Sequence, residues 1–156
     1  LRMPVALGWD NDRGVARIET TAGGALAEDA SLQTVVLFSL FTDAPATAAE
    51  IAASGLGEQR GWWAAAPSIR GTDRVYGSKL WLLLRGTTRR ETLRRAEQYA
   101  LESLAWLIDT KIARTIEVLA DRPLPGWLSL SVTITRPQQL LPPFARLWKL
   151  RSNAVL

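Results

Sequence analysis

Hydrophobic and polar residues alternate most regularly near the carboxyl-terminal end of the chain. From Leu128 to Ile134 an apolar residue occupies every second position, and serine or threonine fills each position between them. Because successive side chains of a strand point to opposite faces, this pattern predicts a strand with one buried and one solvent-exposed face. Residues 113–120 form a second predicted strand, and the turn-forming Pro123–Gly126 between the two predicts an antiparallel hairpin.

The segment of roughly residues 88–109 has the clearest helical pattern. Thr88 and Glu91 have the spacing of a capping box, in which each side chain accepts a hydrogen bond from the backbone N–H of the other residue. Apolar residues then recur at spacings of three and four, which places one set on a single helical face: Leu93, Ala96, Ala100, Leu104, Leu107 and Ile108. We therefore expect one long helix laid across the sheet.

Shorter elements are predicted in the first quarter of the chain. Residues 5–19 have the pattern of a β-hairpin, with its turn near Asp10. Residues 31–41 are expected to form a helix, with Asp29 and Ser31 as the candidate N-caps.

The remaining segments complete the predicted fold. Residues 42–61 are rich in alanine and glycine and are expected to form an ordered loop, whereas residues 144–150 should form a last extended piece. The sum is an α+β fold: a small antiparallel sheet packed against one long helix and a shorter N-terminal helix. No linker or internal repeat divides the chain, so we expect a single domain over residues 1–156.

Composition excludes much of the common chemistry of protein sites. The chain has no cysteine and no histidine, which removes disulfides, thiolate metal sites and imidazole acid–base schemes. Paired carboxylates remain, but Asp10 and Asp12 sit in a predicted turn, where aspartate usually bonds to local backbone. Glu58 and Asp73 flank the central tryptophans and are expected to be solvated loop residues. An enzyme is therefore the least favoured class.

Glycine-rich stretches depart from the nucleotide-binding patterns that they approach. In the stretch Gly55–Gly61 the last glycine comes one residue late, and in Gly71–Lys79 the glycine and lysine are misplaced for a phosphate loop. Such loops depend on a fixed number of backbone N–H groups around the phosphates. We therefore expect no cofactor. Apolar runs such as Leu80–Leu84 are also far shorter than the roughly 20 residues that cross a bilayer.

Positive charge concentrates in the second part of the chain. The net charge is +4; residues 1–60 carry four basic and eight acidic groups, and the rest carry fifteen and seven. Five arginines gather at the start of the predicted long helix, where the helix dipole disfavours cations: Arg85, Arg89, Arg90, Arg94 and Arg95. They predict either a docking site for an acidic protein or nucleic acid, or a solvated face balanced by Glu91 and Glu97.

Several different short motifs follow one another in a characteristic order along most of the chain, from about Trp9 to Trp148. The most distinctive are Arg60-Gly61-Trp62-Trp63, Gly77-Ser78-Lys79-Leu80-Trp81, Ala105-Trp106-Leu107 and the strand Leu130–Pro137. Together they resemble the Mu-type bacteriophage baseplate protein family. The resemblance implies the small lysozyme-like wedge subunit of a contractile tail baseplate, which is a structural component and not an enzyme.

The resemblance also implies partners and a location. The expected partners are other baseplate wedge proteins, the tail sheath, and baseplate hub or tube proteins in a sixfold assembly, with no membrane and with nucleic acid disfavoured. The expected location is the tail baseplate of the virion, assembled in the bacterial host cytoplasm. The alternating strand with a free edge is suited to strand addition by a neighbouring chain, such as the sheath.

Tryptophan and arginine supply all but one of the expected partner-binding residues, because both are enriched at interface hot spots, and Lys79 of the Gly77–Trp81 motif completes the set. These residues are Arg60, Trp62, Trp63, Lys79, Trp81, Arg89, Arg90, Arg94 and Arg95. The four helix arginines are expected to contact acidic wedge partners, and the paired tryptophans to form a hydrophobic contact inside the baseplate. A nucleic-acid-binding module that uses the arginine-rich helix start remains the alternative, and its binding would fall steeply with added salt.

Overall fold

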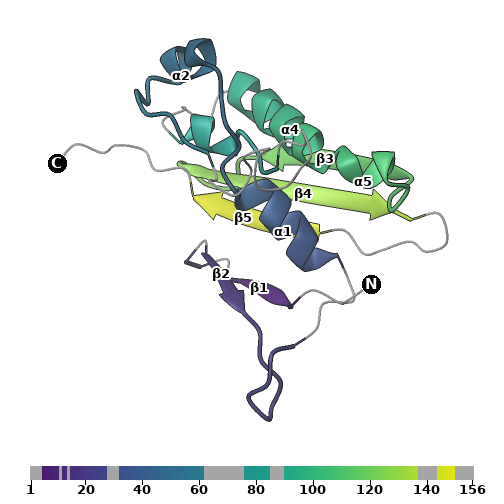
Figure 1. Ribbon diagram of the computed structural model, residues 1–156. Coiled ribbons are helices and arrows are strands. Elements are labelled where there is room, and N and C mark those ends of the chain that lie inside the picture. Colours follow the sequence, from purple (N-terminus) through teal and green to yellow (C-terminus); the bar gives the residue numbers. More distant parts are fainter. Residues whose placement is uncertain are drawn as a thin grey trace.

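The computed structural model describes residues 5–10, 12–13, 15–27, 32–61, 76–84, 90–136 and 144–149. For Trp9 and for residues 144–149 it describes the backbone alone. The elements of this part of the chain (Figure 1) are, in order, β1 (Leu7–Asp10), β2 (Val15–Ile18), α1 (Gln33–Phe41), α2 (Ala48–Ser54), the 3₁₀ helix η2 (Leu80–Leu83), α4 (Arg90–Leu104), α5 (Trp106–Asp109), β3 (Thr115–Asp121), β4 (Trp127–Thr135) and β5 (Phe144–Lys149).

Strands β3, β4 and β5 form an antiparallel sheet with β4 in the middle. Val118 of β3 and Phe144 of β5 both lie opposite Val132 of β4. The predicted hairpin, the last extended piece and the α+β class are thus confirmed. The free edge expected for the alternating strand is wrong, because β4 has a neighbour on each side. Its serine and threonine residues are half-buried and not solvent-exposed, since side chains of a central strand lie between those of its neighbours.

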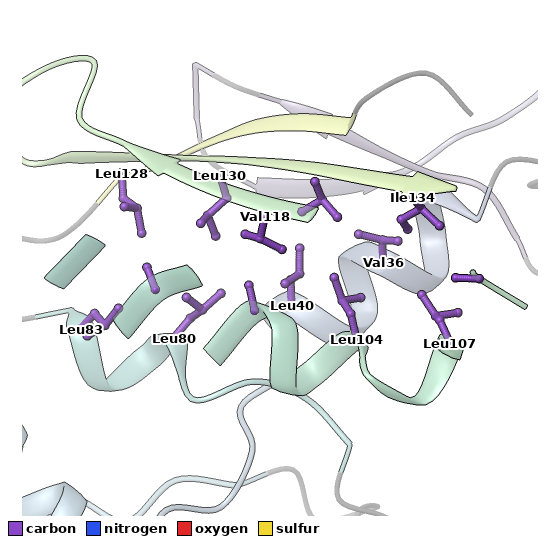
Figure 2. Packing of buried hydrophobic residues seen from close by; sticks show 14 residues of the cluster. Val36, Leu40, Leu80, Leu83, Leu104, Leu107, Val118, Leu128, Leu130 and Ile134 are labelled. Atoms are coloured by element: carbon purple, nitrogen blue, oxygen red, sulfur yellow. The ribbon is translucent and has the colours of Figure 1, made fainter. Parts of the chain in front are cut away.

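The hydrophobic core lies between the inner face of this sheet and the helices. Figure 2 shows its side chains with strands on one side and helices on the other. The alternating apolar residues of β4 are all buried, from Leu128 to Ile134. They meet Val36 and Leu40 of α1 and the apolar face of α4. The predicted inward face of the strand is therefore confirmed, and that of the helix is confirmed for Ala96, Ala100, Leu104 and Leu107.

The long helix is shorter than the sequence indicates. It ends at Leu104, and the short helix α5 follows after Ala105. In α5 the Trp106 Nε1–H donates to Ser39 Oγ in α1 (3.3 Å), and Leu107 is buried. Ile108, which the helical periodicity placed on the inner face, is 45% exposed.

Hairpin β1–β2 is joined to α1 by side chains at the start of that helix. Thr34 Oγ1 accepts from the Leu7 N–H (2.9 Å), and the Gln33 Nε2–H donates to the Leu7 carbonyl (2.9 Å). The N-cap position belongs to Leu32, with φ of 66° and no side-chain cap, so the expected capping by Asp29 or Ser31 is wrong. Contacts between the first turn of α1 and the backbone of Leu7 hold the start of this helix, where a polar N-cap side chain was expected.

The segment 42–61, expected to be a loop, contains α2. Thr47 and Glu50 form a capping box at its start: the Thr47 N–H donates to Glu50 Oε2 (2.8 Å), and the Glu50 N–H to Thr47 Oγ1 (3.3 Å). The other carboxylate oxygen of Glu50 accepts from Lys79 Nζ (2.7 Å), just before η2. Glu50 thus caps its own helix and joins it to a segment distant in sequence. Among the residues described, no helix is long and apolar enough to span a membrane.

This double role makes stability depend on pH. The hydrogen bond from Lys79 and then the one from the Thr47 backbone lower the pKa of Glu50 from 4.5 to about 2. A carboxyl group whose pKa is lower in the folded state than in the unfolded state stabilises the fold. This contribution is complete at pH values above the unfolded-state pKa, and it is lost as the pH falls through the folded-state pKa. Glu50→Gln should therefore reduce the free energy of unfolding above pH 4.5, and the difference from the parent chain should shrink towards pH 2.

Urea unfolding of both chains across this pH range is the measurement. Glu117→Gln is a suitable control, because Glu117 is exposed on β3 and forms no ion pair with another described residue. A difference between Glu50→Gln and the parent that stays constant with pH would contradict an ionic role for Glu50.

Candidate partner-binding surface

The motif that begins at Gly77 ties two distant parts of the backbone together. The Ser78 N–H donates to the Thr42 carbonyl (2.9 Å), and the Ala44 N–H donates to the Ser78 carbonyl (3.0 Å), as in a short parallel bridge. Gly77 has φ of +95°, and a Cβ there would collide with the Thr42 carbonyl. Only glycine combines that conformation with so close an approach of two backbones.

The next residues of the motif are turned inward. Ser78 is buried, and its hydroxyl donates to the Leu40 carbonyl at the end of α1. Trp81 is 2% exposed, and its indole N–H donates to the Ala44 carbonyl (2.8 Å). The expectation that Trp81 contacts a partner therefore fails, since its ring lies in the interior of the chain. Lys79 is occupied by its ion pair with Glu50.

Arg60 packs over the ring of Trp81 and is partly exposed to solvent. Its guanidinium carbon is 5.8 Å from the centre of the Trp81 ring, within the range of a cation–π contact. The guanidinium also lies 3.7 Å from Asp43 and 3.8 Å from Glu58. Burial raises the pKa of Asp43 above its usual value of 3.8, although Arg60 acts in the opposite direction. Arg60 is thus partly used within the chain and partly accessible to a partner.

The arginines of α4 remain on the surface. Arg90, Arg94 and Arg95 are exposed. Arg95 is paired with Glu91 one turn earlier (2.7 Å), whereas neither Arg90 nor Arg94 forms an ion pair with another described residue. Within the described part of the chain, no carboxylate neutralises these two charges, which can attract an acidic surface.

Several of the expected site residues and capping contacts lie outside the described residues. Trp62, Trp63 and Arg89 of the expected interface belong to this group, as do Arg85 and the capping partner Thr88. The paired tryptophans and the first part of the arginine cluster therefore stay predictions.

Glu97, expected to balance the charge of the arginines, has another role. Its Oε1 accepts from the Ala120 N–H of β3 (3.0 Å). Because backbone groups of an edge strand point alternately inward and outward, this bond identifies an outward-pointing N–H at the open edge of β3. Leu119 on the same strand is 70% exposed. Among the described strands, β3 is thus one edge of the sheet, in contact with α4, and β5 is the other.

The Asp10 carboxylate bonds to the backbone of its own turn. Asp10 Oδ1 accepts from the backbone N–H groups of Asp12 and Arg13 (3.0 Å each), as the turn pattern predicted. No group of three or more metal-ligating side chains occurs among the described residues. Sequence reasoning missed Glu50, although Thr47 and Glu50 have the capping-box spacing that was recognised at Thr88.

Comparison with known proteins places these features in a family. The model of the phage protein GP46 family matches residues 32–140. The chain is 38% identical over 140 residues to the baseplate protein gp46 of Escherichia phage Mu, covering 90% of this chain and 92% of that protein. It is 32% identical over 133 residues to the Mu-like prophage FluMu protein gp46 of Haemophilus influenzae, covering 85% and 87%. The chain belongs to the phage protein GP46 family.

Proposed function

We propose that this chain is a structural subunit of a contractile phage tail baseplate, located in the tail of the virion and without catalytic activity. The observation that carries the proposal is the 38% identity to the phage Mu baseplate protein over nine-tenths of both chains. The use of the described carboxylates as caps, turn acceptors and ion-pair partners supports a structural role.

Mass spectrometry of purified tails tests this role. Tails from the bacterium that carries the gene should contain the chain in a fixed ratio to sheath and tube proteins across a density gradient. A chain found only among the soluble proteins, while intact tails are present, would contradict the proposal.

Within the baseplate the chain acts as the small wedge subunit of a sixfold assembly and packs against larger wedge proteins. The exposed charges of Arg90 and Arg94 support an acidic protein partner on this face of α4, and Arg89 is proposed as a further contact. Trp62 and Trp63 are proposed separately, as a hydrophobic contact inside the baseplate. The described part of α4 offers no exposed aromatic side chain for base stacking, because its one aromatic residue, Tyr99, is half-buried against the core. This favours protein over nucleic acid.

Reversing both free charges should block assembly and leave the fold intact. Arg90→Glu with Arg94→Glu inverts the attraction, and carboxylates near a helix N-terminus are favoured by its dipole, so the melting temperature should stay equal or rise slightly. Lys111→Glu with Arg122→Glu is the matched control, since both residues are exposed elsewhere on the surface. Counts of complete tails by electron microscopy, with thermal unfolding of each isolated chain, measure the two effects. Normal tail counts for the Arg90/Arg94 variant would exclude this interface.

The open edge of β3 is the place we propose for sheath attachment. Glu97 occupies one outward N–H at this edge, and the alternation of the strand leaves the outward backbone groups of Ile116 and Val118 for an added strand. The exposed Leu119 would pack against that strand.

A charge on this edge should prevent strand addition, as lysine does on natural edge strands. Leu119→Lys should reduce the capture of the sheath protein by the purified chain. Leu124→Lys should leave it unchanged, because Leu124 is comparably exposed, at 61%, but lies in the turn after β3. Co-purification of the tagged chain with co-expressed sheath protein is the measurement. Equal capture by both variants would contradict attachment at β3.

A further inference from the structure

Within the described part of the chain, hairpin β1–β2 has one edge closed by α1 and one edge open. The side chains of Gln33 and Thr34 bond to both backbone groups of Leu7, which seals the outer edge of β1. On the other side, every residue of β2 is exposed, and no described strand pairs with it apart from β1. An isolated two-stranded hairpin is marginally stable in water and gains from a further strand.

The hydrogen bonds of the hairpin fix which backbone groups this open edge offers. Leu7 points its N–H and C=O away from β2 and lies opposite Ile18. In an antiparallel pair, two residues directly opposite either exchange both hydrogen bonds or both point away. Ile18 therefore points its N–H and C=O out of the open edge, and so do Ala16 and Thr20, two positions on either side.

The neighbouring residue confirms this alternation. The Glu19 N–H donates to the Ala6 carbonyl (3.0 Å), and the Glu19 carbonyl accepts from the Ala27 N–H (3.0 Å). Both backbone groups of Glu19 thus point into the hairpin. The outward residues are those with even numbers from Ala16 to Thr20.

Opposite charges flank the centre of the open edge. Arg17 and Glu19 are exposed on either side of Ile18, and their side chains share the face opposite to that of Ile18. The Glu19 carboxylate lies over Gly8, the residue that pairs with Arg17. Neither charge forms an ion pair with another described residue.

We propose that the open edge of β2 binds β2 of a second copy of the chain, antiparallel, about a twofold axis at Ile18. Hydrogen bonds between the copies require outward residues to face each other. The registers that pair at least two of the three outward residues are centred on Arg17, Ile18 or Glu19. The first places the two copies of Arg17 face to face, and the last does the same with Glu19; like charges directly opposite are destabilising.

Only the register centred on Ile18 is electrostatically favourable. It places Arg17 of each copy opposite Glu19 of the other, and Ala16 opposite Thr20. Ile18, 61% exposed in the single chain, meets its own counterpart. The pairing joins two hairpins into one continuous four-stranded sheet. It concerns the free chain, uses an edge separate from β3, and does not depend on the proposed role in the baseplate.

A charge exchange between two variants tests the pairing. Arg17→Glu places like charges opposite each other in a pair of identical chains, and so does Glu19→Arg. Each variant alone should have a dimer dissociation constant raised roughly tenfold or more. In an equimolar mixture the new carboxylate at position 17 of one variant faces the new guanidinium at position 19 of the other. The native Glu19 of the first variant then faces the native Arg17 of the second, as in the parent pair. A heterodimer should therefore form with the affinity of the parent chain.

Analytical ultracentrifugation to about 1 mM chain, a range suited to small interfaces, measures the association. The parent chain and the control Arg13→Glu, which changes an exposed turn residue outside the pairing, should dimerise alike. Circular dichroism establishes that each variant is folded. A parent chain that stays monomeric, single variants that dimerise like the parent, or a mixture that stays monomeric would each overturn the proposal.

Discussion

The contact between the backbones of Gly77 and Thr42 determines much of this structure, because no side chain fits between them. The bridge that follows holds the end of α1 beside the start of η2. From that position Ser78 reaches the Leu40 carbonyl and the Trp81 indole reaches the Ala44 carbonyl. A single glycine thus allows residues more than thirty positions apart to share one interior.

Charged residues divide into those that hold the chain together and those that face outward. Glu50, Lys79, Asp43 and Glu97 connect helices, loops and the β3 edge to one another. Arg90 and Arg94 on α4, and Arg17 with Glu19 on the hairpin, have no such partner among the described residues. Arg17 lies on β2 and Glu19 follows directly after this strand, whereas Arg90 and Arg94 lie on the exposed side of α4. This arrangement suits a protein whose work is association, because backbone groups supply affinity and charges select the register and the partner.

Sequence periodicity predicted the elements that pack across a single face. The inner side of β4 and the row from Ala96 to Leu107 are correct, since burial repeats with the period of the element itself. Ile108 departs from its row, because α4 ends at Leu104 and Ile108 lies in the separate short helix α5, where it is exposed. Helix α2 consists mostly of small residues and has no buried face, so hydrophobic periodicity did not predict it. The capping-box spacing of Thr47 and Glu50 would have predicted its start, but it was overlooked.

The sequence by itself determined the strands of the main sheet, most of the long helix with its buried row, and the family. Each of these depends on neighbouring residues or on motifs that can be read in order. Tertiary structure alone decided that β4 is central and not an edge, that Trp81 is interior, and that Lys79 is paired with Glu50. The physical reason is that neither the burial of Trp81 nor the ion pair of Lys79 depends on its sequence neighbours. The segment that packs over it decides, and here that segment comes from about thirty to forty residues away in the chain.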